Sequence, residues 1–210
     1  MTIKNILYIY LLFLVVSNIS CQKAKNNAEP RYAYNLKNFP LNINDQWRYK
    51  VTDFYYNSID TITLKVVNKI QNNDSEIDWR CNIYDDSLVI DSGLFRQIND
   101  RLSYDGLNPN YSYFGNLIFS FPITPNSYWI GDYAVDTVRL ISIDSNITIQ
   151  SKTYENVFYI KRAFNLIGNY GFVQTIQLSK NVGIISQSLY VSNGGLVQNQ
   201  DFELIDYVLY

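Results

Sequence analysis

The feature of this chain that most constrains its fold is a side-chain alternation with a period of two, which recurs along most of its length. In the segment 133–143, for example, Tyr133, Val135 and Ile141 share one face. Such alternation predicts β-strands, because successive side chains of a strand point to opposite faces of a sheet. Similar stretches, rich in residues that favour strands, occur at 46–56, 59–70, 76–84, 86–91, 93–98, 154–165, 170–179, 182–192 and 195–209.

Turn-forming residues separate these stretches. Asn72-Asn73-Asp74, Asp105-Gly106 and Asp144-Ser145-Asn146 are predicted turns, because Asn, Asp and Gly tolerate the backbone angles that tight turns need. We therefore expect an all-β domain at residues 36–210, with a single curved, largely antiparallel sheet or half-barrel meander. The segment 108–128 contains three prolines and is predicted to be an irregular loop across one end of the sheet.

Residues 1–20 have the form of an export signal rather than of a folded element. Lys4 is the only charge before Cys21, and the apolar run 6–16 is shorter than the roughly 20 residues that span a bilayer. Cys21 follows the small residue Ser20, as lipoprotein signal peptidase requires, although Asn18 stands where the usual motif has leucine. We predict that Cys21 is lipidated through its sulfur, with fatty acids such as palmitate. The alternative is an ordinary secreted protein with a free thiol at Cys21.

The composition excludes several kinds of chemistry. The chain has no histidine, which rules out Ser-His-Asp and Cys-His catalysis and every histidine metal site. With Cys21 lipidated, Cys81 is the one remaining thiol, so no disulfide framework forms. Cys81 shares a face with Ile77, Trp79 and Ile83, which indicates a buried structural thiol rather than a nucleophile.

The charge balance gives no reason to expect a nucleic-acid partner. The net charge is −2, and it becomes −3 when Lys4 is removed with the signal. Nucleic-acid binding requires a basic stripe. No bound cofactor or metal is expected, and we predict that the protein is not an enzyme.

A spacing recurs in the two parts of the chain. Phe39-Pro40 is followed by Trp47, and Phe121-Pro122 is followed at the same distance by Trp129. An asparagine, Asn44 or Asn126, precedes each tryptophan by three residues, where it can take a left-handed turn conformation. The repeat reflects either two related halves or coincidence.

These residues resemble a group of uncharacterised Bacteroidota lipoproteins. The group's Phe-Pro-Leu…Gly…Trp-x-Tyr opening element matches Phe39-Pro40-Leu41 and Trp47-Arg48-Tyr49, with Asn44 in place of the glycine. Its later valine-glycine-isoleucine strand is similar to Asn181-Val182-Gly183-Ile184-Ile185. The resemblance implies a curved antiparallel sheet, related to the half-barrels of lipoprotein-sorting factors, and brings no catalytic residues.

The segment 21–35 is polar and is predicted to be a tether. In many Bacteroidota lipoproteins an acidic cluster after the cysteine directs export to the cell surface. Here Gln22-Lys23-Ala24-Lys25 is basic instead. We therefore expect the protein at the outer membrane, facing the periplasm.

Two groups of residues are candidate sites. The carboxylates of Asp74, Glu76 and Asp78 stand at alternate positions and could supply oxygen ligands to a calcium ion, but a solvated turn entering a strand is the better interpretation. Aromatic residues gather in and beside the long loop, where exposed rings would contact a sugar or a protein partner, whereas buried rings would plug the sheet. The proposed binding surface consists of Tyr104, Tyr111, Tyr113, Tyr128 and Trp129.

Three functional hypotheses follow. The first is a lipid-anchored envelope protein that binds a protein or glycan partner without catalysis. The second is a carrier or chaperone for an acyl chain or lipoprotein, which requires a partly unfilled apolar inner face. The third, a carboxylate-dependent hydrolase, has no specific support in the sequence.

Overall fold

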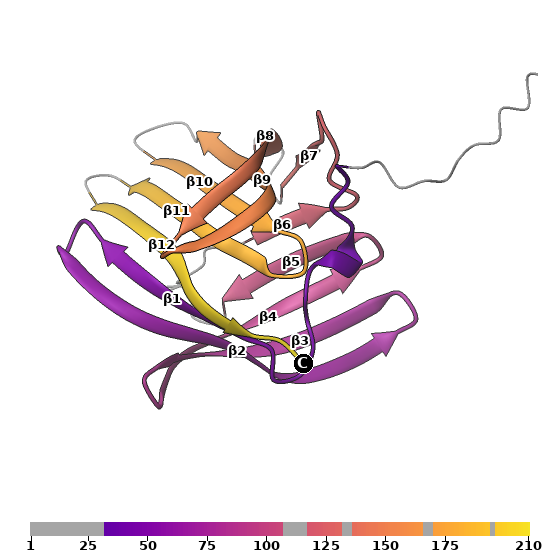
Figure 1. Cartoon of the computed structure of the whole chain (residues 1–210), viewed down its shortest axis with the longest axis horizontal. Coiled ribbons are helices and arrows are strands. Elements are labelled where there is room, and N and C mark those ends of the chain that lie inside the picture. The colour runs from indigo at the N-terminus through magenta and orange to yellow at the C-terminus, as the bar shows by residue number, and fades with distance from the viewer. Residues whose placement is uncertain (1–31, 107–116, 132–135, 166–169, 194–195) are drawn as a thin grey trace, which may run out of the picture. The chain divides into compact units, whose positions relative to one another are not determined.

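Twelve strands form one continuous, curved and nearly closed sheet (Figure 1). The computed structural model describes residues 32–106, 117–131, 136–165, 170–193 and 196–210. The elements in chain order are η1 (Leu36–Asn38), a 3-10 helix, then β1 (Gln46–Asp53), β2 (Ser58–Asn73), β3 (Glu76–Asp85), β4 (Leu88–Ile98), β5 (Arg101–Gly106), β6 (Leu117–Ser120), β7 (Tyr128–Ile130), β8 (Thr137–Ile149), β9 (Lys152–Asn165), β10 (Tyr170–Ser179), β11 (Gly183–Asn193) and β12 (Leu196–Val208).

The strand order is that of two six-stranded meanders joined side by side. It runs β6-β5-β4-β3-β2-β1-β12-β11-β10-β9-β8-β7, and every described ladder is antiparallel. The last strand, β12, pairs with the first, β1, from Gln46 opposite Val208 to Asp53 opposite Gln200. The predicted all-β fold with a single curved antiparallel sheet is confirmed.

One apolar cluster fills the inner face of the sheet. Tyr49 on β1 lies opposite Ile62 on β2, and both side chains are buried, as the alternation predicts. The hydroxyl of Tyr49 donates a hydrogen bond of 2.9 Å to the carbonyl of Ile184, which ties the first meander to the second. Each fully buried aliphatic or phenylalanine side chain stabilises the fold by roughly 1.5–3 kcal/mol. The cluster spans both meanders, and a second, smaller cluster of Phe172 and Leu189 lies in the second meander.

The two Phe-Pro…Trp elements share a tight turn, although the Phe121-Pro122 peptide bond is cis and the Phe39-Pro40 bond is trans. The amide of Asp45 donates to the carbonyl of Asn42 at 3.0 Å, and the amide of Ser127 donates to Thr124 at 2.9 Å, which closes one tight turn in each half. The tryptophan then lies in the strand that follows, which pairs with the next strand of its own meander.

The equivalence extends beyond these turns. Asp45 accepts a bond from the amide of Val66, and Ser127 accepts one from Leu140. In both halves the register shifts directly after the donor residue. The β2–β3 ladder shifts between Val66 and Asn68, and the β8–β9 ladder shifts between Leu140 and Ser142. A shared irregularity at one equivalent position favours two related halves over coincidence, because bulges are specific features of a fold.

Several predicted boundaries are wrong. The two strands expected at 86–91 and 93–98 are the single strand β4, and β5, β6 and β7 were not predicted. Asp144-Ser145-Asn146 lies inside β8, where pairing with β9 overrides the turn preference of these residues. The turn instead falls at Gln150 and Ser151, whose φ angles are 47° and 68°. Within the predicted loop 108–128, residues 108–116 lie outside the described ranges.

Candidate functional site

The predicted binding surface divides into a buried and an exposed part. Two of its residues, Tyr111 and Tyr113, lie outside the described residues, as does the predicted lipidation site, Cys21. Tyr104 is 1% exposed and its ring centroid is 4.7 Å from that of Phe95, so its prediction as a surface residue is wrong. It belongs to the core because β5 continues the inward alternation of the sheet.

The remaining two aromatic residues lie on the short edge strand β7. Tyr128 is 60% exposed. Trp129 is half-buried against the core, and its indole nitrogen donates a 3.1 Å bond to the carbonyl of Ile118 on β6. This bond joins the two edge strands of the sheet, β6 and β7. Of Tyr104, Tyr128 and Trp129, the described residues of the predicted binding surface, only Tyr128 is mostly exposed.

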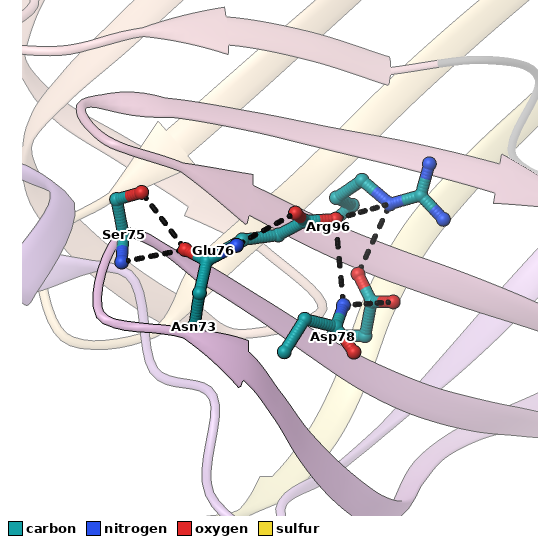
Figure 2. A network of polar contacts seen from close by, with 6 residues as sticks. Asn73, Ser75, Glu76, Asp78 and Arg96 are labelled. Carbon is teal, nitrogen blue, oxygen red and sulfur yellow. Dashed lines mark hydrogen bonds and ion pairs between the residues drawn. The ribbon is translucent and has the colours of Figure 1, made fainter.

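The acidic turn between β2 and β3 is held by a guanidinium group (Figure 2). The Nε atom of Arg96 on β4 lies 3.0 Å from Asp78 Oδ1 and 3.9 Å from Glu76 Oε1. Asn73 Oδ1 accepts bonds from the backbone amide and hydroxyl of Ser75, which fixes the turn itself. The hydrogen bond to Asp78 is the main cause that raises the pKa of Arg96. The turn is therefore a local ion-pair network, in which Asp78 is buried and Arg96 is partly exposed.

No metal centre is formed within the part of the chain that the structure describes. No group of three or more Cys, Asp or Glu residues there has the geometry to hold an ion. Cys81 is fully buried, and desolvation raises the pKa of its thiol, which keeps it protonated and unreactive. This agrees with the structural thiol that the sequence indicates.

A buried ion pair lies on the inner face of the second meander. Asp136 is 0% exposed, and its two carboxylate oxygens accept bonds of 3.0 and 2.9 Å from Nε of Arg162. The guanidinium carbon lies 5.2 Å from the ring centroid of Phe172. Arg162 shares its inward face with Ile160 on β9, so charge is placed inside the curved sheet. Because each group satisfies the other, we assign the pair to structure rather than to catalysis.

A surface that the sequence did not reveal is the turn between β1 and β2. Phe54, Tyr55 and Tyr56 are 54%, 54% and 76% exposed. The turn lies at the left margin of Figure 1, at the end of the β1–β2 hairpin. The rings of Tyr55 and Tyr56 meet edge to face at 5.0 Å. We call these three residues the aromatic turn.

The backbone of the aromatic turn is fixed by one buried carboxylate. Asp53 Oδ1 accepts bonds from the amides of Tyr55 and Tyr56 at 2.9 and 3.0 Å. Its other oxygen accepts a 2.7 Å bond from the side-chain amide of Gln200 on β12. The three exposed rings are thus carried on a preorganised loop.

Two hollows near the start of β1 both have Tyr207 in their walls. The larger, of about 540 Å³, lies between the β8–β9 hairpin and the turn that joins β10 to β11, and Lys152, Tyr154 and Lys180 contribute to its walls. The smaller, of about 230 Å³, lies on β1, β2 and β12 and includes Arg48. Both are open to solvent, and polar and apolar groups line each of them.

The fold and these surfaces define an all-β protein with one curved twelve-stranded sheet and several exposed polar and aromatic surfaces. The chain matches no protein-family model and no curated protein sequence. Among the described residues, no helix is long and apolar enough to cross a membrane.

The solved structures that are similar to this chain include two proteins from Bacteroides and Parabacteroides. One is a protein from Bacteroides fragilis described as exported, with a YmcC-like fold; it is 9% identical, with a TM-score of 0.49, and the match covers 84% of this chain and 99% of that one. The other is a protein from Parabacteroides distasonis described as a lipoprotein; it is 12% identical, with a TM-score of 0.45, and the match covers 81% of this chain and 97% of that one.

Proposed function

We propose that this chain is a lipid-anchored, non-catalytic binding protein of the bacterial envelope, which contacts a protein partner through the aromatic turn. The single observation that carries the proposal is the exposure of three consecutive aromatic side chains on a turn whose backbone is fixed. Tyrosine and phenylalanine supply a large contact area and lose little side-chain entropy on binding. Binding energy at protein interfaces concentrates in such residues.

The shape of the turn favours a protein over a glycan as the partner of this surface. The rings extend from the end of a hairpin, so they fit into a hollow on the partner rather than enclose a ligand. A folded protein offers such a hollow, whereas a glycan chain does not. The amide of Phe54 also donates a 2.9 Å bond to the carbonyl of Asn199, which holds the base of the turn against β12.

The anchor in this proposal is the lipid on Cys21, with the segment 21–35 as a tether. The sequence motif around Cys21 supports the anchor. The absence of an acidic cluster after the cysteine favours the periplasmic face of the outer membrane. Substituting Cys21→Ser should abolish labelling by a palmitate analogue and release the protein from the membrane fraction. Retention of the label would contradict the anchor without affecting the aromatic turn.

The acyl-carrier hypothesis loses support from the inner face. A carrier requires apolar space inside the sheet, yet the Asp136–Arg162 pair and the buried amides of Gln174 and Gln187 lie there. Placing an acyl chain beside them would remove polar contacts that a hydrocarbon cannot replace. We therefore propose no lipid cargo for the inner face.

The proposal is tested by a photo-crosslinking amino acid placed at Tyr56 in the full-length chain, in the bacterium that makes it. The matched control is the same crosslinker at Leu88, which is 69% exposed at the first position of β4. A discrete adduct at position 56, absent at position 88 and reduced by Asp53→Ala, is the expected result, since that change removes the acceptor that orders the turn. Equal adducts at both positions, or none, would contradict it.

A further inference from the structure

Three carboxylates stand in a diagonal row on one face of the first meander. Asp60 on β2 comes two residues before the buried Ile62, so the two side chains share the inner face. Asp85 on β3 pairs with Ile62 and therefore lies on the same face. Asp91 on β4 pairs with Ile83, which is buried and comes two residues before Asp85 on β3. Each carboxylate is thus a diagonal neighbour of the next, at roughly 7–8 Å.

We call Asp60, Asp85 and Asp91 the acidic row. Within the described ranges, none of the three forms an ion pair. The segments between strands that lie outside those ranges contain no lysine or arginine in their sequence; they are 107–116, 132–135, 166–169 and 194–195. The described part of the chain therefore leaves the acidic row without a counter-cation.

Asp91 is the member of the row that points to a ligand. Its side chain is buried, and within the described part of the chain its Oδ2 atom has no hydrogen-bond partner. Desolvation raises the pKa of Asp91, which reflects the cost of holding this charge out of water. A buried carboxylate oxygen without a donor destabilises a fold, and carboxylates with such perturbed pKa values are concentrated at functional sites.

The spacing of the row favours a ligand with several separate charges over a single metal ion. Among the described residues, no group of three or more Cys, Asp or Glu side chains could hold one ion. Neutralising the whole row therefore requires positive charges distributed along the length of a ligand. Leu88 pairs directly with Asp85 and is 69% exposed, so an apolar side chain lies beside the carboxylates. Methylene groups between the charges of such a ligand can pack on it, as the stems of lysine side chains do on apolar surfaces.

We propose that the acidic row binds a linear polyamine, whose ammonium groups contact Asp60, Asp85 and Asp91 in turn. Each contact is a charge-assisted hydrogen bond, which is stronger than a bond between neutral groups. The ammonium group that reaches Asp91 supplies the donor that its Oδ2 atom lacks. Asp53, which orders the aromatic turn, is not part of this site, so the site is independent of the proposed protein partner.

The test is isothermal titration calorimetry of the full-length Cys21→Ser chain with spermine at low salt. Calcium ions are the comparison with concentrated charge, and tetralysine carries ammonium groups on a peptide. Asp85→Asn and Asp91→Asn should each weaken spermine binding by roughly tenfold, the usual effect of losing one charge-assisted hydrogen bond. Asp91→Asn also relieves a buried charge, so weaker binding by this variant would not come from unfolding. The matched control is Asp74→Asn, at an exposed carboxylate that follows the far end of β2.

The expected result is binding of one spermine molecule per chain, which weakens with salt and with the two row variants but not with Asp74→Asn. Absence of binding, equal binding of calcium, or an equal loss with Asp74→Asn would overturn the proposal. Tighter binding of tetralysine than of spermine would also overturn it, because the row would then fit a basic protein segment. None of these outcomes depends on a crosslink at Tyr56, so the two proposals fail separately.

Discussion

Asn44 and Asn126 occupy equivalent positions in the two halves of the sheet, with φ angles of 76° and 70°. Each is the third residue of a tight turn that the amide of the next residue closes, three residues before the tryptophan. Left-handed backbone is unfavourable for most residues, and asparagine tolerates it better than others. The recurrence of one special conformation at one spacing links the sequence repeat to the structure.

The first prediction concerns this backbone conformation. Asn44→Ala should lower the free energy of unfolding by about 1 kcal/mol, because alanine resists the left-handed region, whereas Asn44→Gly should be neutral or slightly stabilising. Urea denaturation measures both. Asn146→Ala, at an exposed position on β8 without a positive φ, is the control and should change little. Equal stability of Asn44→Ala and the unmodified chain would contradict the role of the turn.

The sequence predicts these two turns but not the aromatic turn, for a physical reason. The alternating stretch predicted as a strand at 46–56 continues past Asp53, so alternation alone gives a longer strand. The strand stops where the Asp53 carboxylate takes the amides of Tyr55 and Tyr56 out of the ladder. A side-chain hydrogen bond to the backbone decides this boundary, and no periodicity reports it.

The burial of Tyr104 was missed for a related reason. β5 has six residues, and only Leu102 and Tyr104 alternate inward. Two inward positions are too few for a period-two pattern to stand out from a nearby aromatic cluster. Long strands such as β9 and β12 were predicted correctly because their alternation continues over more residues.

The second prediction concerns the buried ion pair. Arg162→Met leaves Asp136 charged and without its guanidinium inside the sheet, which should cost about 3–5 kcal/mol in the free energy of unfolding. Adding Asp136→Leu should recover part of this loss, since the unpaired charge is then removed. Urea denaturation of both variants measures the coupling. Lys152→Met, which breaks the exposed pair with Asp206, is the control and should cost less than about 1 kcal/mol.

The third prediction uses the close approach of β4 to a core tyrosine. A Cβ atom added at Gly93 would lie 2.2 Å from the hydroxyl oxygen of Tyr104, and the ring cannot move freely because it packs against Phe95. Gly93→Ala should therefore destabilise the fold by about 1–3 kcal/mol, as overpacking does. In the double variant with Tyr104→Leu, the loss should be smaller than the sum of the two single losses. Additive losses, measured by thermal unfolding, would show that the ring yields to the new methyl group.

The fourth prediction concerns pH and rests on a carboxylate with an unfavourable environment. Asp91 is 8% exposed, and within the described part of the chain its Oδ2 atom has no hydrogen-bond partner, while Oδ1 accepts a 2.8 Å bond from the amide of Ser92. Desolvation raises the pKa of Asp91, and the bond from Ser92 only partly opposes this. The native state therefore holds its proton to higher pH than the unfolded chain does, so stability is lost as pH rises from the ordinary carboxyl pKa through the raised native value.

Asp91→Asn removes this titration and keeps an oxygen to accept the bond from Ser92. The variant should unfold at a higher temperature than the unmodified chain at pH 7, by about 2–4 °C for each kcal/mol of desolvation relieved. The difference should shrink as the pH is lowered and nearly vanish by about pH 3, where the aspartate is largely protonated in both states. Calorimetry from pH 3 to pH 8 measures it. The control is Asp60→Asn, at an exposed carboxylate on β2, which should show no such gain in unfolding temperature. A gain for Asp91→Asn that persists at low pH would contradict the prediction, because the side-chain amide itself, rather than relief of a buried charge, would then stabilise the fold.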